Sequence, residues 1–250
     1  MQKVFGRGKG LSDVPFSFCP GCTHGIIMRL VAEVMEELDI IKDTIGVSPV
    51  GCAGFCQDFF TCDFVGGPHG RAQAIGTGIK RALPDKIVFT YQGDGDIAAI
   101  GTQHAIHCAA RGEKITSIMV NNALYGMTGG QMAPTTLEGM KTTTSPYGRD
   151  LNINGYPIDL PKTIATLDGA VYVASVSVDS PKNILQAKKA IKKAFKVQQA
   201  GLGFALVSVL STCPTNWGLS PQESLKWLRE NLMPHYEMGE LKVTEEVKNL

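Results

Sequence analysis

Several features that would place this protein in a membrane or on a nucleic acid are missing from its sequence. No run of about 18 apolar residues occurs among its 250 residues, which excludes a membrane-spanning helix. Its 24 Lys plus Arg and 23 Asp plus Glu residues leave no excess of positive charge for binding a polyanion. The first 18 residues contain no apolar signal-peptide core, so we expect a cytoplasmic protein.

Disulfide bonds are not expected either, although seven cysteines are present. A reducing cytoplasm keeps thiols free, and a chain of this length can bury enough apolar surface to fold without cross-links. The cysteines are therefore candidate ligands of a metal ion or a cluster. Glycine is abundant, with 28 residues against the ~7% of an average protein, and it gathers beside apolar runs, which predicts backbone lying against a ligand.

Short apolar runs alternate with amphipathic stretches along the chain. We expect strands at 44–50, 86–91, 115–121, 171–178 and 204–210, and helices at 24–38, 71–83, 97–111, 181–199 and 221–232. This alternation predicts an α/β domain, a three-layer sandwich with a mostly parallel sheet covered on both faces.

No internal repeat and no shift in composition divides the chain. We expect one domain over residues 1–235 and a charged C-terminal tail over residues 236–250. The segment 124–161 is rich in Gly and Pro and has few periodic apolar positions. A loop of this length inside a compact domain is usually a lid or a binding loop.

Acidic and amide side chains follow two of the expected strands. One strand ends in Gly93-Asp94-Gly95-Asp96 and the next in Asn121-Asn122. A right-handed crossover would bring Asp94 and Asn122 to the same carboxyl edge of neighbouring strands, where open α/β sheets bind ligands. Asp94, the Asn122 amide oxygen and a main-chain carbonyl near Leu124 would suit Mg²⁺ holding a diphosphate.

Two other interpretations of these residues are open. The run from Gly93 to Ala98 also fits the G-x-G-x-x-A dinucleotide fingerprint, with Glu113 twenty positions after Gly93. That interpretation sets Asp94 and Asp96 against a pyrophosphate without a cation, and Glu113 precedes the next strand instead of ending it. Alternatively, Asp94 caps a helix and Asn122 belongs to a turn, which leaves their pairing unexplained.

The cysteines form a second signal. Cys19 and Cys22 make a C-x-x-C unit before a helix, and Cys52 and Cys213 each follow an expected strand. Four such thiolates on loops can converge on an iron-sulfur cluster or on zinc, and their chemistry does not separate the two. Cys56 and Cys62 compete for the third and fourth positions. Cys108 lies in an expected helix and is interpreted as a small buried apolar residue.

Together these motifs resemble a known family. The motifs are Phe18-Cys19-Pro20-Gly21-Cys22, Val50-Gly51-Cys52-Ala53-Gly54, His69-Gly70-Arg71, Gly93-Asp94-Gly95-Asp96, Asn121-Asn122, Tyr125-Gly126-Met127-Thr128-Gly129-Gly130-Gln131 and Thr212-Cys213-Pro214. Their order and spacing over residues 12–235 resemble the thiamine diphosphate-binding beta subunit of 2-oxoacid:ferredoxin oxidoreductases. The likeness is nearest to the 2-oxoisovalerate and 2-oxoglutarate types.

The resemblance implies a set of site residues. It implies that Cys19, Cys22, Cys52 and Cys213 hold a [4Fe-4S] cluster, and that Asp94, Asn122 and the Leu124 carbonyl hold Mg²⁺. It also implies that thiamine diphosphate is lined by Val50, Gly51, Cys52, Ala53, His69, Gly95, Asp96, Gly126 and Met127. Cys56 and Cys62 receive no role from the family pattern.

The resemblance further implies oxidative decarboxylation of a 2-oxo acid to acyl-coenzyme A and CO₂, with electrons passing through the cluster to ferredoxin. Expected partners are alpha, gamma and ferredoxin-like delta subunits, one of which would supply the carboxylate that activates the cofactor. Several family members carry a lysine where this chain has Gly129, so the 2-oxo acid is not identified. A non-oxidative thiamine enzyme subunit with a Cys₄ zinc site and an electron-transfer subunit without chemistry of its own are the alternatives.

Overall fold

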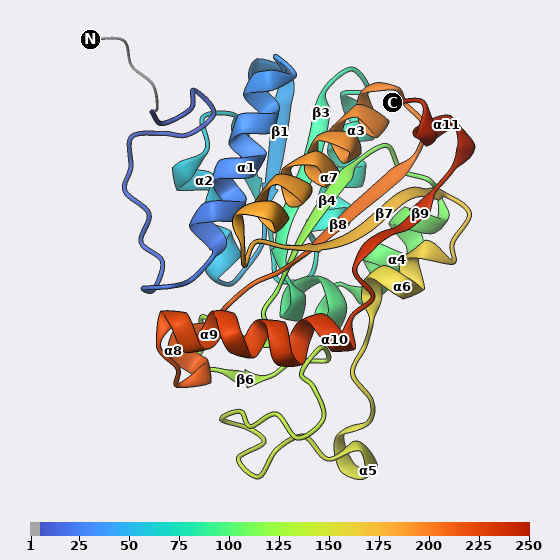
Figure 1. Cartoon of the computed structure of the whole chain (residues 1–250). Coiled ribbons are helices and arrows are strands. Elements are labelled where there is room, and N and C mark those ends of the chain that lie inside the picture. The colour runs from blue at the N-terminus through green and yellow to red at the C-terminus, as the bar shows by residue number, and fades with distance from the viewer. Residues whose placement is uncertain (1–5) are drawn as a thin grey trace.

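The apolar runs of the sequence form a central seven-stranded sheet in the computed structural model, which describes residues 6–250 (Figure 1). The spatial order of the strands is β2-β1-β3-β4-β8-β7-β9. Their bounds are β1 Thr44–Ser48, β2 Asp63–Gly66, β3 Ile87–Gly93, β4 Thr116–Asn121, β7 Ala170–Ser177, β8 Phe204–Leu210 and β9 Gly239–Val243. All neighbours pair in parallel except β9, which runs antiparallel to β7. Every residue of β4 and β8 is buried, as expected of strands covered on both faces.

Helices cover the two faces of this sheet and enclose two apolar cores. One core lies under α1 (His24–Glu37), α2 (Cys56–Phe59) and α7 (Pro181–Gln199). The other lies under α3 (Ala72–Ala82), α4 (Thr102–Ala110) and α6 (Leu160–Ala165). Burying one large side chain such as Phe195 of α7 contributes roughly 1.5–3 kcal/mol, so these two layers supply most of the driving force for folding.

Helix α7 shows how the sequence sets these elements. It begins at Ser180, whose hydroxyl accepts a hydrogen bond from the Asn183 amide at 3.3 Å, and Pro181 occupies the first helical position. Its apolar stripe faces the sheet, while Lys188 on another face lies 2.7 Å from carboxylate oxygens of both Glu33 and Glu37 on α1. The two helices are therefore held side by side by apolar packing against the sheet and by ion pairs on another face.

A third apolar cluster lies at the carboxyl edge of the sheet. It is formed by the C-terminal helical segment, which crosses beneath the strand ends in Figure 1, and by residues such as Leu124 and Met140. The turns of this segment are α8 (Pro214–Trp217), α9 (Pro221–Trp227), η4 (Leu228–Leu232) and α10 (Met233–His235). A capping box between Ser220 and Glu223 begins α9.

The remaining elements are short. They are η1 (Ile41–Asp43), η2 (Cys52–Phe55), η3 (Asp96–Ile100), the paired strands β5 (Leu124–Tyr125) and β6 (Gln131–Met132), α5 (Leu151–Asn154) and α11 (Glu245–Lys248). None of the helices in the described part of the chain has the length and apolar character of a membrane span.

The predicted fold class is confirmed, and all five expected strands are present within a few residues. The helix expected at 97–111 is divided, because it starts as the π-helical turn η3 and becomes α-helical only after Gly101. The segment 236–250 is not a separate tail in the structure. Its residues 239–243 form β9, because Leu241 and Val243 pack against the two opposite cores while the backbone pairs with β7. Residues 1–5 of the predicted domain lie outside the described residues.

Candidate cofactor site

The site begins where β3 and β4 end side by side. Gly93 pairs with Val120 in the parallel register, so Asp94 and Asn122 emerge together at the carboxyl edge. Asp94 is 1% exposed and has no ion-pair partner among residues 6–250. Burial raises the pKa of Asp94 to about 7, although hydrogen bonds from the Thr135 hydroxyl and from the main-chain amide of Asn122 oppose the rise. A cation next to this carboxylate would remove the cost of its burial.

The turn after β4 is a rigid structure. The side chain of Asn121 accepts a hydrogen bond from the Ala123 amide at 3.1 Å, and that of Asn122 accepts one from the Leu124 amide at 3.3 Å. Ala123 has a φ of 60°, a left-handed conformation that a non-glycine residue adopts only where its surroundings enforce it. The Trp217 indole donates a hydrogen bond to the Asn122 carbonyl at 3.3 Å, so α8 also stabilises this turn.

His69 and Asp96 form a second pair at the same edge. His69 Nδ1 lies 2.5 Å from Asp96 Oδ1, which also accepts a hydrogen bond from the Gly70 amide at 2.8 Å. The other carboxylate oxygen of Asp96 accepts a hydrogen bond from the Gln92 side-chain amide. The Gln92 side-chain oxygen accepts one in turn from the Gln73 side-chain amide at 2.5 Å. Both oxygens of Asp96 thus accept hydrogen bonds from the protein, and His69 Nδ1 lies close to one of them without a hydrogen bond to it.

These residues surround one cavity of about 80 Å³ at the carboxyl edge. All twelve residues that the sequence assigned to thiamine diphosphate or to Mg²⁺ line it: Val50, Gly51, Cys52, Ala53, His69, Asp94, Gly95, Asp96, Asn122, Leu124, Gly126 and Met127. Gly95 is required there by packing, since a Cβ at that position would lie 2.4 Å from the Tyr125 ring. Backbone therefore forms much of the cavity wall, an arrangement suited to a phosphate-bearing ligand.

Four cysteines lie beside this cavity. A Cβ built on Gly126 would lie 3.5 Å from Cys52 Sγ and 3.6 Å from Cys213 Sγ, so sulfurs from two distant segments flank the same glycine. Burial, together with the nearby Cys213, Cys52 and Cys19 thiols, raises the pKa of the Cys22 thiol to about 12, although a hydrogen bond from the His24 amide opposes the rise. The four thiols predicted as cluster ligands therefore act on one another electrostatically.

The other three cysteines lie elsewhere. Cys56 is fully buried in the core under α1, and Cys62 is the cysteine that interacts with it. Cys108 is buried in α4, 3.7 Å from the Thr77 hydroxyl. The structure thus separates the seven cysteines into a set of four beside the cavity, a pair and a single residue. Within residues 6–250, no three His, Cys, Asp or Glu side chains come close enough to hold a single metal ion together.

Three residues of the site were not predicted from the sequence. Thr135 donates to Asp94 from a position 41 residues away, a separation that carries no sequence signal. Tyr125 belongs to a quoted motif but was given no role, and its ring lies against both Gly95 and His69. His24 lines the cavity and its Nδ1 lies 2.9 Å from the Tyr91 hydroxyl. A histidine on the apolar face of α1, two residues after Cys22, was a signal that could have revealed it.

The comparisons with known proteins give this arrangement a class. The profile of the family "Thiamine pyrophosphate enzyme, C-terminal TPP binding domain" matches residues 49–209, a span that contains β2 to β7, most of β8 and every residue lining the cavity except His24. The fold and the site thus define a thiamine pyrophosphate-binding domain.

Individual relatives narrow the class. The ketoisovalerate oxidoreductase subunit VorA of Methanothermobacter thermautotrophicus is 46% identical over 232 residues, covering 93% of this chain and 49% of that protein. The 2-oxoglutarate synthase subunit KorB of Methanocaldococcus jannaschii is 42% identical over 224 residues, covering 87% of this chain and 78% of that protein. The solved 2-oxoglutarate:ferredoxin oxidoreductase from Magnetococcus marinus, with 2-oxoglutarate, coenzyme A and succinyl-CoA bound, matches with a TM-score of 0.78 and 29% identity over 94% of this chain and 84% of that one.

This chain belongs to the family of thiamine pyrophosphate-binding beta subunits of 2-oxoacid:ferredoxin oxidoreductases. It spans about half the length of two of its relatives, the VorA proteins of two Methanothermobacter species, at 49% and 48%.

Proposed function

We propose that this chain is the thiamine diphosphate-binding subunit of an enzyme that oxidatively decarboxylates a 2-oxo acid to an acyl-coenzyme A and CO₂. Electrons would leave through a [4Fe-4S] cluster on this chain to ferredoxin. The observation that carries the proposal is the convergence of Asp94, His69 and Cys52 on one cavity, with three further cysteines beside it. Thiamine diphosphate supplies a carbon nucleophile and an electron sink for such a reaction.

Asp94, Asn122 and the Leu124 carbonyl fit a Mg²⁺ ion. Asp94 is a buried carboxylate without a basic partner in the described chain, and all three residues line the same cavity. Mg²⁺ prefers oxygen ligands and usually keeps phosphate oxygens among them. This chain would hold the ion on one side and leave the other side to the diphosphate. Thr135 would fix the orientation of the Asp94 carboxylate from behind.

Other residues of the chain would bind and orient the cofactor. The wall formed by Gly51, Gly95 and Gly126 allows close approach of backbone amides to phosphate oxygens. With its Nδ1 beside Asp96, His69 would present its other ring nitrogen to the cavity.

Cys19, Cys22, Cys52 and Cys213 fit a four-iron cluster better than a zinc ion. Tetrahedral zinc with Zn–S bonds of about 2.3 Å needs its sulfurs roughly 3.8 Å apart. No three potential ligands in residues 6–250 are grouped at single-ion spacing, whereas a [4Fe-4S] cluster binds each thiolate through a different iron. This disfavours the alternative of a non-oxidative enzyme with a Cys₄ zinc site.

The substrate and partners are proposed from the named relatives. Those names include a ketoisovalerate oxidoreductase and 2-oxoglutarate synthases, so we propose a branched-chain 2-oxo acid or 2-oxoglutarate as substrate. Alpha, gamma and ferredoxin-like delta subunits would complete the complex. Turnover of 2-oxoisovalerate, 2-oxoglutarate and pyruvate by the assembled complex would identify the acid.

The test of the cofactor site is Asp94→Ala, with the exposed Asp168→Ala as its matched control. Both variants are purified anaerobically with their co-expressed partner subunits, and thiamine diphosphate binding is titrated with and without Mg²⁺. We expect Asp94→Ala to weaken Mg²⁺-dependent binding by roughly 100-fold or more, about 2.7 kcal/mol, while the iron content stays unchanged. Wild-type affinity in Asp94→Ala would refute the assignment.

A further inference from the structure

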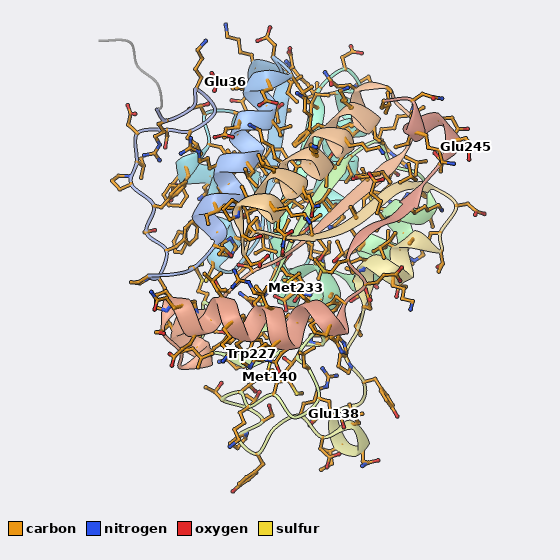
Figure 2. All side chains as sticks on the ribbon, viewed as in Figure 1. Glu36, Glu138, Met140, Trp227, Met233 and Glu245 are labelled. Atoms are coloured by element: carbon orange, nitrogen blue, oxygen red, sulfur yellow. The ribbon has the colours of Figure 1, made fainter. Side chains whose placement is uncertain are left out.

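The segment formed by residues 138–158 stands away from the body of the molecule. In Figure 1 it extends below the C-terminal helical segment and carries α5 near its far end. In Figure 2, Met140 lies just below Trp227 of α9, where the segment leaves the body, and Glu138 lies further down, next to α5. Met140 belongs to the apolar cluster under α9 and η4, so the root of this segment is fixed to the fold. We call residues 138–158 the arm.

The arm has a fixed shape although most of it is exposed. Arg149 is only 5% exposed, and its guanidinium group forms no ion pair with a carboxylate of residues 6–250. It donates instead to six main-chain carbonyls, those of Ala133, Pro134, Thr136, Asn154, Gly155 and Tyr156, at 2.6–3.3 Å. Three of these carbonyls precede the arm and three lie within it. The buried Arg149 guanidinium therefore joins the backbone just before the arm to the backbone near its C-terminal end.

Further hydrogen bonds close the base of the arm. The Ile158 amide donates to the Pro134 carbonyl at 2.9 Å, and the Thr143 amide donates to the Gly130 carbonyl at 3.0 Å. Within the arm, a Cβ on Gly148 would lie 2.6 Å from the Gly139 carbonyl oxygen, so the backbone segments around these two glycines are in direct contact. The conformational entropy of the arm is thus lost during folding of this chain and is not a cost of a later binding step.

The arm exposes large apolar and aromatic side chains. Tyr147 is 97% exposed, Ile153 81% and Tyr156 76%, the highest values for large hydrophobic residues in the described chain. A hollow of about 670 Å³ opens between residues 138–150 and α5, next to these side chains. The charged side chains of the arm are Glu138, Lys141 and Asp150, which are exposed, and the buried Arg149. Exposed aromatic side chains on a backbone of fixed shape are typical anchors of protein interfaces, and they do not suit a polyanion.

The position of the arm next to the cofactor cavity indicates which partner it binds. Thr135, three residues before the arm, donates to Asp94, so the arm leaves the body at the wall of the cofactor cavity. That cavity measures about 80 Å³, whereas sites that enclose a ligand of this class measure roughly 300–1,000 Å³. Another protein surface must enclose the rest of the cofactor.

We propose that the arm is a preformed docking element that binds the partner domain closing the open side of the thiamine diphosphate site, through Tyr147, Ile153 and Tyr156. This inference rests on the proposed function in its choice of partner. The partner surface contains apolar pockets that receive these three side chains. The arm root and the cavity then lie on one continuous interface, and docking of the arm aligns the partner with the cofactor.

The test compares the triple variant Tyr147→Ser, Ile153→Ser, Tyr156→Ser with the control Leu185→Ser, a residue 62% exposed on α7. Each chain is mixed with the partner subunit of the same complex that encloses the cofactor, and the dissociation constant is measured. We expect the triple variant to bind roughly 100-fold more weakly and Leu185→Ser to bind as the wild type does. Unchanged binding by the triple variant, with an unchanged thermal midpoint, would overturn the proposal.

Two further measurements separate this inference from other outcomes. Iron content and Mg²⁺-dependent cofactor binding should be the same in the triple variant and the wild type when both are saturated with the partner. If the wild-type complex oxidises no 2-oxo acid while the difference in assembly remains, the proposed function fails and the docking role stands. If the isolated wild-type chain self-associates and the triple variant does not, the arm binds a second copy of this chain and the proposal is wrong.

Discussion

At the scale of single residues, Asp94 and Asp96 show how two adjacent acidic groups acquire different chemistry. Both are buried and both line the cavity. Both oxygens of Asp96 accept hydrogen bonds, from the Gly70 amide and the Gln92 side chain, and His69 lies beside one of them. Asp94 receives hydrogen bonds but no positive charge, and burial raises its pKa. Of the two carboxylates, Asp94 is therefore the one suited to a cation.

A prediction at this scale concerns the cysteines. Cys52→Ser removes a sulfur that flanks Gly126, whereas Cys108→Ser alters a thiol buried in α4. We expect the first variant to lose the proposed cluster and the second to retain about four iron atoms per chain. Iron and sulfide counts on anaerobically purified protein, with the visible spectrum before and after dithionite, measure this. Four irons in Cys52→Ser and none in Cys108→Ser would exclude the proposed ligand set.

At the scale of elements, glycines mark where backbone segments meet. A Cβ on Gly169 would lie 2.3 Å from the Ala109 carbonyl oxygen and 2.5 Å from the Gly112 amide, because the start of β7 touches the end of α4. Gly78 lies on the exposed side of α3, and a Cβ there would meet no atom within 4 Å. Gly169 is thus required by a close backbone contact, whereas Gly78 has space for a larger side chain.

These two positions give a matched pair of stability predictions. Gly169→Ala forces backbone segments apart, so we expect it to lower the free energy of unfolding by roughly 1–3 kcal/mol. Gly78→Ala improves helix propensity without a clash and should raise that free energy by roughly 0.5–1 kcal/mol. Urea unfolding of both variants beside the wild type measures the difference. A stabilised Gly169→Ala would contradict the contact between α4 and β7.

At the scale of the whole molecule, the C-terminal helical segment connects the sheet to the site. The Arg229 guanidinium donates to an Asp179 carboxylate oxygen at 2.7 Å and to the Asp179 carbonyl at 2.6 Å. Further along, the Tyr236 hydroxyl donates to the Thr135 carbonyl at 2.9 Å, and Thr135 donates to Asp94. The segment therefore links the end of β7 to the loop that supports the cavity.

The Asp179–Arg229 pair makes a pH-dependent contribution to stability. Burial by itself raises the pKa of Asp179, but hydrogen bonds from Arg229, Asn183 and Ser177 outweigh it and hold the pKa below its ordinary value of 3.8. A lowered carboxyl pKa stabilises the fold above the unfolded-state pKa, and this stability is lost as the pH falls through the folded-state pKa. We expect Asp179→Asn to unfold at lower urea than the wild type at pH 6 to 7.

The difference between the two proteins should shrink as the pH falls below about 4, because protonation removes the same charge from the wild type. Glu230→Gln is the matched control, since Glu230 lies 3.9 Å from Lys226 in an exposed pair and should change little at any pH. A constant difference between wild type and Asp179→Asn from pH 3 to pH 7 would show that the ion pair is not its cause.

The sequence by itself determined five of the seven strands of the sheet, the principal helices and twelve of the residues that line the cavity. Buried parallel strands are continuous apolar runs, and their carboxyl ends are marked by the polar residues that follow them, as with Asp94 after β3 and Asn122 after β4. Such signals are local, so they can be read along the chain.

Only the tertiary structure decided which distant segments complete the site and which remain exposed. Thr135 reaches Asp94, Tyr125 packs on Gly95, and residues 239–243 join the sheet, each through contacts between residues far apart in the chain. The arm is the clearest case, because its Gly- and Pro-rich sequence is that of an ordinary long loop. Its fixed shape comes from Arg149 binding six carbonyls, and hydrogen bonds to backbone carbonyls leave no pattern in side-chain identity.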